Sequence, residues 1–320
     1  MNCIVCAIAK LENEYIYEWA YYHLSLGFTR IHIYDNNDFE GESISDVFKG
    51  TEIENDVIIH NVRGLRGVQK KVYQDCYTQE DFDWCAFIDV DEFITFSDKC
   101  KGLTISGFLE NKDSFDAVHL NWLCYGDCGQ LTKKTIGVLE RFKTPIMPID
   151  FKSEYFDKAE NSHIKSIIKK GCNLDWLNDE VSEVGSNPHT PFGLDKVCDE
   201  RGMLVENSPW NTMSFQIAYI RHFITMTIEE YARKDKRKAA DSAFETNRYK
   251  PSKFFLYNPV SFKRLLVMYK IYGYLPLKEI IQVRVLWWSV TRGLPISYLF
   301  SSYRRFIKRK RVAASIKQAI

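Results

Sequence analysis

Apolar and polar positions along the first ninety residues predict strands and helices in alternation. Residues 3–9 (CIVCAIA) form an uninterrupted apolar run, which is typical of a strand buried on both faces. Residues 13–27 place aromatic and apolar side chains at helical spacing and end at a glycine. Further strands are expected at residues 30–37, 56–62 and 83–90, and one more helix is expected at residues 68–80. Strands and helices that alternate through short links predict βαβ units and a mostly parallel sheet covered by helices.

After about residue 110 the pattern loosens and the predicted elements become shorter. Strands are expected at residues 116–126, 163–170 and 215–223, the second of them as an antiparallel addition to the sheet. A helix is expected from Thr227, because Glu230 follows it at the spacing of a capping box. Beyond residues 250–260 the chain is helical, aromatic and basic. We therefore expect an α/β domain at 1–250 and a helical, basic C-terminal extension at 251–320.

Composition changes this picture little. The chain has 43 Lys and Arg against 42 Asp and Glu, so its net charge of +1 indicates no particular partner. The nine cysteines are odd in number and scattered, which argues against a disulfide framework and favours a reducing compartment. Cys3 and Cys6 stand three apart in a predicted strand, so they face opposite sides and are not expected to share zinc. The first residues lack the pattern of a signal peptide, and no window has the roughly 18 uninterrupted apolar residues of a membrane span.

Three carboxylates follow the apolar run of the fourth predicted strand: Asp89, Asp91 and Glu92. In an extended segment Asp89 and Asp91 lie on the same side, so both can reach one metal ion. Oxygen ligands favour Mg²⁺ or Mn²⁺, which bridge to phosphates and stabilise a diphosphate leaving group. On this motif alone, a solvated acidic turn is an equal alternative. An EF-hand loop fits poorly because Phe93 stands at a ligand position, and an aspartyl nucleophile is expected on a first strand.

Five blocks in order along the chain extend this motif: residues 7–38, 82–94, 120–129, 163–170 with 187–193, and 219–240. The second block, FDWCAFIDVDEFI, contains W-x-x-F-x-D-x-D-E-F. Together the blocks resemble the GT-A glycosyltransferases of the family 2-like branch, which is also akin to family 92. The resemblance implies a GT-A (Rossmann-like) mixed, mostly parallel sheet flanked by helices. It also implies inverting transfer of a sugar from a nucleotide-diphosphate sugar to an acceptor hydroxyl.

The resemblance further implies roles for individual residues. Asp89 and Asp91 would bind the divalent cation, Mn²⁺ or Mg²⁺, and the diphosphate. The residues implied near the nucleotide are Lys10, Asn13 and Glu14 in its pocket, with Asp35 and Asn36 near the base or ribose. Lys165 and the cations of the basic helix after Thr227, Lys234 among them, are candidates to neutralise phosphate, and a solvated basic face is the alternative for that helix. His189 and His222 are candidates to complete the metal shell, and the alternative for each is a core or surface histidine.

Inversion also needs a base to take the proton from the acceptor. Glu92, next to the metal pair, and Asp127, in a glycine loop that could close over the sugar, are the two candidates. Glu92 could equally brace its loop. Trp122 is a candidate to stack on a sugar ring, although burial is the commoner outcome for tryptophan. Asp127 and Cys128 depart from the family pattern in this loop, which leaves the acceptor open.

Aromatic and basic residues dominate residues 283–311, with six Arg and Lys between 303 and 311. This combination suits a helix at the surface of an anionic membrane, and a packed helix with a basic solvent face is the alternative. No nucleic-acid motif accompanies it. We expect a bacterial enzyme on the cytosolic face of the membrane that glycosylates a lipopolysaccharide, capsule or other lipid-linked precursor. The rival classes are a metal-dependent phosphate-ester hydrolase and a membrane-associated scaffold without enzymatic activity.

Overall fold

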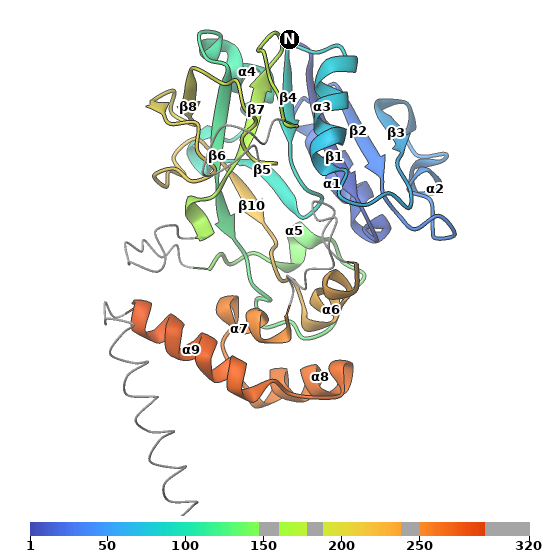
Figure 1. Cartoon of the computed structure of the whole chain (residues 1–320), viewed down its shortest axis with the longest axis vertical. Coiled ribbons are helices and arrows are strands. Elements are labelled where there is room, and N and C mark those ends of the chain that lie inside the picture. The colour runs from blue at the N-terminus through green and yellow to red at the C-terminus, as the bar shows by residue number, and fades with distance from the viewer. Residues whose placement is uncertain (147–159, 178–187, 238–249, 292–320) are drawn as a thin grey trace, which may run out of the picture.

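The computed structural model describes residues 1–146, 160–177, 188–237 and 250–291. A twisted sheet with its covering helices forms one part, and the last helices lie below it (Figure 1). The strands are β1 (Cys3–Ala9), β2 (Arg30–Asp35), β3 (Val57–Asn61), β4 (Trp84–Phe87), β5 (Glu92–Phe96), β6 (Ala117–Cys124), β7 (Ile164–Lys169), β8 (Val197–Asp199), β9 (Leu204–Val205) and β10 (Ala218–His222). The helices are α1 (Asn13–Ser25), α2 (Ser45–Phe48), α3 (Gln69–Gln79), α4 (Ile105–Leu109), α5 (Val138–Arg141), α6 (Ile228–Arg237), α7 (Phe254–Tyr257), α8 (Phe262–Tyr272) and α9 (Leu277–Thr291).

The amino-terminal half of the sheet is parallel, with strands in the order β3-β2-β1-β4. All seven residues of β1 are buried, because helices cover both of its faces. Cys3 and its alternate neighbours pack with Trp19 of α1, whereas Cys6 packs with Tyr73 of α3. The prediction that Cys3 and Cys6 face opposite sides is therefore confirmed, and all nine cysteines are free thiols. The α/β class predicted from alternating elements is also confirmed.

The other half of the sheet is mixed. Strand β7 runs antiparallel to both β4 and β6, as predicted for residues 163–170. Strand β10 pairs in parallel with β6 and antiparallel with β5. Strand β5 was not predicted, because its apolar residues follow the acidic motif without a helix between them. The chain thus passes from the parallel half to the far edge of the sheet within a few residues.

The acidic motif itself corrects the sequence analysis. The predicted strand at 83–90 ends at Phe87, and residues 89–92 form a turn closed by the Glu92 N–H donating to Asp89 O at 3.0 Å. The expectation that Asp89 and Asp91 lie in an extended segment with both side chains on one side is therefore wrong. The turn is required because β4 and β5 occupy different positions in the sheet. It also directs the two carboxylates toward different partners.

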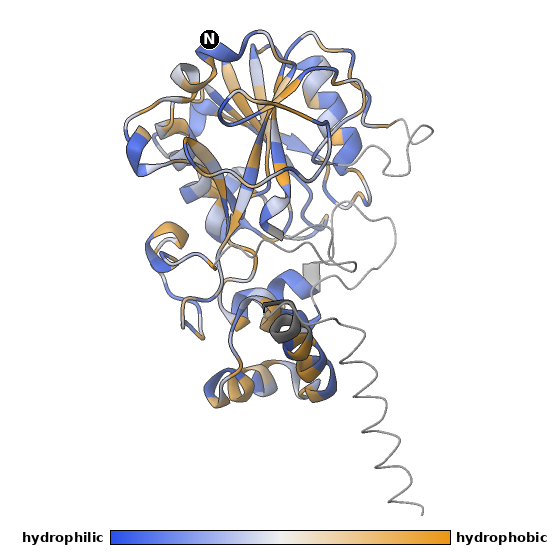
Figure 2. Cartoon of the chain, turned by 90° about the vertical axis from the view of Figure 1, so that its left-hand side faces the viewer, coloured by the Kyte–Doolittle hydropathy of each residue, from blue (hydrophilic) through white to orange (hydrophobic). Residues whose placement is uncertain are grey.

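Helices α6 to α9 form a smaller layer with its own apolar cluster. Phe254, Phe255 and Met268 pack there against Ile228 and Tyr231 of α6. Figure 2 shows apolar stretches along the strands of the sheet and helices of mixed hydropathy in this layer. The helical character predicted beyond residue 250 is confirmed for the described part, residues 251–291, while 292–320 lie outside it. In the part of the chain that the structure describes, no helix has the length and apolarity needed to cross a bilayer.

Candidate functional site

The site is built at the end of β1 and β4, where the strand order changes direction. Strands β2 and β3 lie on one side of β1, and the chain reaches β4 on its other side. In open α/β sheets, ligands bind at the carboxyl ends of strands at this kind of switch point. The residues that follow β1 and β4 are Lys10 to Asn13 and the turn of Asp89 to Glu92. The fold thus brings the first and fourth strand ends together, as the sequence predicted.

Each of the two aspartates of the turn pairs with a lysine. Asp89 Oδ2 accepts a hydrogen bond from Lys165 Nζ at 2.8 Å, and Gln69 Nε2 lies 3.3 Å from Asp89 Oδ1. Asp91 Oδ2 accepts from Lys234 Nζ at 2.5 Å. The side chain of Asp89 is 36% exposed, whereas that of Asp91 is 7% exposed. The turn therefore carries one accessible carboxylate and one enclosed carboxylate, each balanced by a cation.

The two lysines are buried, and acceptor oxygens surround each of them. Lys165 extends from β7, and its side chain is 1% exposed. Burial acts to lower the pKa of Lys165, but the carboxylates of Asp89 and Glu92 outweigh it and raise that pKa well above its usual range. Lys234, from α6, also donates to the carbonyl oxygens of Phe223 and Ile224. Buried charges are stable only when paired, so both lysines depend on the turn.

Glu92 supports the turn from inside. It is fully buried, and its Oε2 accepts the Asp89 N–H at 2.8 Å and lies 3.3 Å from Lys165 Nζ. Burial raises the pKa of Glu92 well above its usual range, and the Lys165 charge opposes this. Trp19 Nε1 donates to the backbone oxygen of Glu92. In this geometry Glu92 stabilises the turn, and its role as a base stays a prediction.

A group of aromatic rings adjoins the enclosed aspartate. His222 Nε2 lies 3.8 Å from Asp91 Oδ2, and its ring centroid lies 4.2 Å from that of Trp122. Burial lowers the pKa of His222 to about 4. The His189 centroid lies 5.3 Å from Trp122, and His189 Nδ1 lies 2.7 Å from Ile164 O. Trp122 is 8% exposed, so it separates the two histidines rather than lying open as a platform for a sugar ring.

Residues after β2 hold their own loop in shape. Asp35 is buried, and its two oxygens accept the N–H groups of Asn37 and Ile44 at 3.0 Å each. Asn36 Nδ2 donates to Val62 O and Leu65 O at 2.9 Å each. A contact of Asp35 or Asn36 with a base or ribose stays a prediction. What the structure shows is that both side chains stabilise the loop.

The loop after β1 is tied to the loop after β2. Lys10 Nζ donates to Asp38 Oδ1 at 2.8 Å. Asn13 Nδ2 donates to Ser43 O at 3.0 Å, and Asn13 Oδ1 accepts from Asn37 at 2.9 Å. Lys10 and Asn13 therefore lie at the predicted edge of the sheet. Together with the loop of Asp35 they form one hydrogen-bonded rim.

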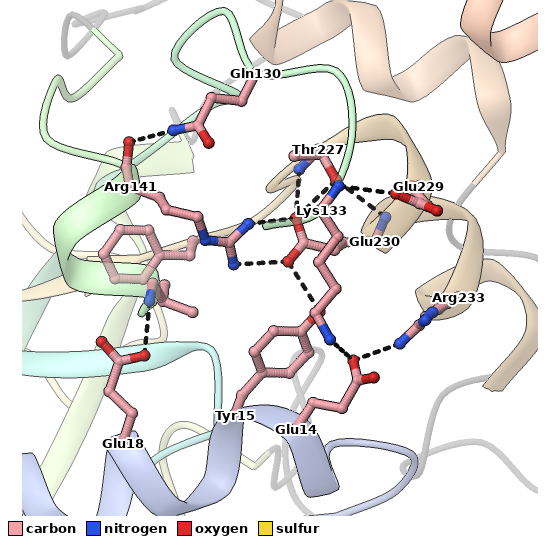
Figure 3. Close-up of polar contacts among 12 residues, drawn as sticks. Glu14, Tyr15, Glu18, Gln130, Lys133, Arg141, Thr227, Glu229, Glu230 and Arg233 are labelled. Atoms are coloured by element: carbon pink, nitrogen blue, oxygen red, sulfur yellow. Dashed lines mark hydrogen bonds and ion pairs between the residues drawn. The ribbon is translucent and has the colours of Figure 1, made fainter. Parts of the chain in front are cut away.

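Glu14 belongs to a second polar cluster, between α1 and α6 (Figure 3). Glu14 accepts hydrogen bonds from Lys133 and Arg233, and these contacts hold its pKa below the usual value although burial acts to raise it. Beside it, Glu230 accepts two hydrogen bonds from Arg141, at 3.0 and 2.7 Å, and one from the Tyr15 hydroxyl at 2.9 Å. This cluster joins segments that are far apart along the chain.

A small cleft lies between this cluster and the acidic turn. Its walls include Leu11, Tyr15, Asp91, Met226, Glu230 and Lys234. Leu11 and Met226 have positive φ angles of 54° and 51°. Such backbone is unfavourable for residues with a Cβ and gathers at functional sites. The cleft thus joins the predicted Asp91 to two strained positions that periodicity does not identify.

Asp127 lies elsewhere than predicted. It is 2% exposed, and Arg264 of α8 donates to both of its oxygens, at 2.5 and 2.8 Å. Its backbone N–H donates to Asn258, just after α7, at 2.7 Å. The expectation of a mobile loop whose carboxylate faces the sugar is therefore corrected. Asp127 attaches the last helices to the sheet domain, and its two oxygens are engaged in that attachment.

Sequence reasoning missed Arg141 and Tyr15, and it treated Lys234 only as one cation of a basic helix. The capping box offered the one available signal. Thr227 N donates to Glu230 Oε2 at 3.1 Å, and Glu230 N donates to Thr227 Oγ1 at 3.3 Å, so the predicted box is confirmed. The partner Arg141 lies 89 residues away from Glu230 along the chain, in a four-residue helix without a marked pattern.

Comparison with known proteins adds an independent finding. The sequence description of glycosyltransferase family 92 matches residues 3–242. A family 92 protein of Arabidopsis thaliana is 27% identical over 181 residues, which are 50% of this chain and 31% of that protein. One from Oryza sativa subsp. japonica is 29% identical over 94 residues, which are 29% of this chain and 16% of that protein. The matched segments span less than a third of these relatives' lengths.

Two solved structures are similar at low scores. Staphylococcus aureus TarS (residues 1–349) gives a TM-score of 0.33 at 12% identity, covering 85% of this chain and 71% of that chain. HddC of Yersinia pseudotuberculosis, complexed with GMP-PN, gives 0.29 at 13% identity, covering 53% of this chain and 70% of that chain. Likeness at this level carries no argument about the site.

Proposed function

The chain belongs to glycosyltransferase family 92, and from that premise we propose that it is an inverting glycosyltransferase. It would move a sugar from a nucleotide-diphosphate sugar to a hydroxyl of a cell-surface glycan precursor. The observation that carries the proposal is the turn after β4. There Asp89 and Asp91 each pair with a buried lysine, at the switch point of the sheet. Phosphates and a divalent cation are the ligands that suit this arrangement.

The charges of the turn support a bound pair of cation and diphosphate. Two aspartates and two lysines balance one another in this structure. A divalent cation and a diphosphate of opposite charge add little net charge to such a site. The carboxylates can then turn to the cation and the lysines to the phosphates, so that every buried charge keeps a partner. Lysine suits this exchange because its ammonium is a point charge on a flexible chain.

The residues present fit Mn²⁺ or Mg²⁺. Such ions are commonly held by one or two carboxylates together with substrate phosphates. Asp89 and Asp91 would supply the carboxylates, and His222 is the nearest candidate for a further ligand because its Nε2 lies 3.8 Å from Asp91. When bound, the cation would stabilise charge on the leaving diphosphate. Lys165 and Lys234 would bind phosphate oxygens, and Glu92 would keep the turn in place from inside.

Attachment to a membrane is part of the proposal. Helices α8 and α9 expose large apolar side chains: Phe262 at 80%, Tyr269 at 53%, Leu277 at 51% and Ile281 at 56%. Lysines 263, 270 and 278 stand among them in the sequence. Apolar and basic residues together favour binding to an anionic bilayer. The predicted basic segment at 303–311 lies outside the described residues. We place the enzyme at the cytosolic face of a bacterial membrane, where a lipid-linked acceptor would be reached.

Calorimetric titration with a panel of UDP- and GDP-sugars, with and without Mn²⁺, tests the proposal. Metal-dependent binding of a nucleotide sugar supports it, and release of the free nucleotide upon addition of an acceptor extract extends it. Turnover of phosphate esters without nucleotide-sugar binding would instead identify a hydrolase. Binding of neither ligand would leave the scaffold reading.

Vesicle sedimentation tests the membrane part. A variant with Phe262→Ser and Leu277→Ser should bind vesicles that contain about 30% anionic lipid more weakly than the unchanged chain does. Phe39→Ser is the control, because Phe39 is 75% exposed but follows β2, far along the chain from α8. Equal binding by all three proteins would refute the role of this face.

A further inference from the structure

A second group of metal-binding side chains lies on the outer part of the parallel sheet, apart from the acidic turn. It consists of His32 of β2, His60 of β3 and Glu80, which follows α3. In the described part of the chain, these are the only three His, Cys, Asp or Glu residues whose ligand atoms all lie within 4.8 Å of one another. Helix α3 leads back to the start of β4, so the end of α3, which Glu80 follows in the sequence, lies toward the end of the sheet opposite the turn (Figure 1).

The distances between the ligand atoms of these three residues are close to the distances between ligand atoms around a tetrahedral metal ion. His32 Nδ1 lies 3.1 Å from His60 Nε2 and 3.7 Å from Glu80 Oε2, and His60 Nε2 lies 3.8 Å from Glu80 Oε1. A tetrahedral Zn²⁺ with bonds of about 2.0–2.1 Å holds its ligand atoms about 3.3 Å apart. Glu80 faces each ring through a different oxygen, so a rotation of its carboxylate together with small shifts of the rings would bring one oxygen and both ring nitrogens into bonding distance. The fourth position would go to water.

The rings are held in place before any ion binds. The His60 ring stacks on Tyr34, with centroids 4.3 Å apart, and on His32, with centroids 5.4 Å apart. The His32 side chain is 3% exposed. The side chains of His60 and Glu80 are 26% and 25% exposed, which gives an ion a route from solvent.

We propose that His32, His60 and Glu80 form a zinc site that ties the edge strand β3 and its neighbour β2 to the end of α3. Two imidazoles and one carboxylate are a donor set that favours Zn²⁺ over Mg²⁺ or Mn²⁺. The site thus differs from the turn of Asp89 and Asp91, where two carboxylates are the main candidate ligands. Its effect is on the sheet edge, where a bound ion would join the hydrogen-bonded strands β2 and β3 to the end of α3.

The test is zinc binding by the full chain after removal of metals with a chelator. Zinc affinity is measured by competition with a chromophoric chelator, and stoichiometry by elemental analysis. Excess Mg²⁺ is present to compete with Zn²⁺ for the carboxylates of Asp89 and Asp91. The unchanged chain should bind one Zn²⁺, and Glu80→Gln or His60→Asn should weaken that binding by about 100-fold or more. Asp81→Asn is the matched control, because the exposed Asp81 stands next to Glu80 outside the group.

Two further readouts keep the result clear. Zn²⁺ should raise the thermal midpoint of the unchanged chain and of Asp81→Asn, but not that of the two ligand variants. UDP-sugar binding in Mn²⁺ should be the same for Glu80→Gln as for the unchanged chain, so a failure of the proposed enzymatic function is seen separately. Zinc affinity that is unaffected in both ligand variants, or absent in the micromolar range, would overturn the proposal and leave a hydrogen-bonded cluster.

Discussion

Two groups of paired carboxylates in this protein differ in the cation that holds them. In the acidic turn, Asp89 and Asp91 pair with Lys165 and Lys234. Between the sheet domain and the last helices, two other carboxylates pair with arginines through two hydrogen bonds each, Glu230 with Arg141 and Asp127 with Arg264. A guanidinium holds a carboxylate in a fixed planar geometry, whereas an ammonium is a mobile point charge.

The difference indicates what each group is for. Lysine pairs can exchange partners when a phosphate or a metal enters, so they suit a binding site. Arginine pairs keep one geometry, so they suit the joint between parts of a fold. On this basis substitutions in the turn should change ligand binding more than stability, and substitutions at the arginine pairs should do the reverse.

The largest expected effect concerns stability, at Glu230. Glu230→Gln should lower the free energy of unfolding by about 3–5 kcal/mol, because it leaves the charge of Arg141 buried and without its partner. Arg141 and Glu230 have side-chain exposures of 2% and 1%, so water cannot replace the lost contact. Urea denaturation followed by circular dichroism measures the loss. A loss below about 1 kcal/mol would contradict a structural role and would favour a role in the adjoining cleft.

The next effect concerns binding, at Asp91. Asp91→Asn should reduce Mn²⁺-dependent UDP-sugar affinity by about 100-fold, equal to about 2.7 kcal/mol. It removes a charge that both the metal and Lys234 use. The thermal midpoint should fall less than in Glu230→Gln, because Lys234 keeps two backbone acceptors, Phe223 O and Ile224 O. Undiminished metal-dependent binding by a folded variant would refute the metal role of Asp91.

Much of the parallel half could be predicted, because apolar periodicity reports burial directly. Residues 3–9, 30–37, 56–62 and 68–80 all became the expected elements. The acidic motif could not be placed in the same way. FIDVDEF reads as one extended segment, yet the backbone turns because β4 and β5 need different neighbours. Register and strand order depend on distant partners that local pattern does not encode.

The site shows the same division. The sequence singled out Lys165 as a cation, but its place beside Asp89 could not be predicted, because it depends on the antiparallel pairing of β7 with β4. Asp127 could not be placed correctly, because its glycine-rich neighbours suggest mobility while its partner Arg264 lies 137 residues later. The geometry of a carboxylate, rather than its residue type, decides whether it binds a ligand or holds the fold.

A moderate effect is expected at Arg264. Arg264→Lys keeps the positive charge but loses the two-point contact with Asp127, so it should cost about 1–2 kcal/mol of unfolding free energy. The affinity for UDP-sugar should be unchanged, because Asp127 contacts Arg264 of α8 and is not part of the acidic turn. Lys263→Arg, one residue earlier, is the control for chemistry at this helix. A loss of donor affinity without loss of stability would place Asp127 in the binding site after all.

A substitution at Glu92 distinguishes a structural role in the turn from a role as general base. The expected change in turnover for the structural role is small. Glu92→Gln keeps an oxygen that can accept the Asp89 N–H, so turnover should remain within about fivefold of the unchanged enzyme if Glu92 is a brace. A general base replaced by an amide loses about 10²–10⁴-fold in turnover. Steady-state rates with saturating donor distinguish the two ranges. A rate in the lower range would assign Glu92 to proton transfer.

The smallest effect is a pH dependence at the arginine pairs. Burial acts to raise the pKa of Glu230, but the hydrogen bonds and charge of Arg141, with Thr227, hold it below its ordinary value of 4.5. A carboxylate whose pKa is lower in the folded state stabilises the fold above its unfolded pKa and loses that contribution as pH falls through its folded pKa. Stability should therefore decline below about pH 4.5 in the unchanged chain, and this decline should be shallower in Glu230→Gln.

Urea midpoints measured from pH 6 to pH 3 give both slopes. Equal slopes would mean that other carboxylates dominate acid unfolding and that the Arg141 pair, although buried, contributes to stability without contributing to its pH dependence.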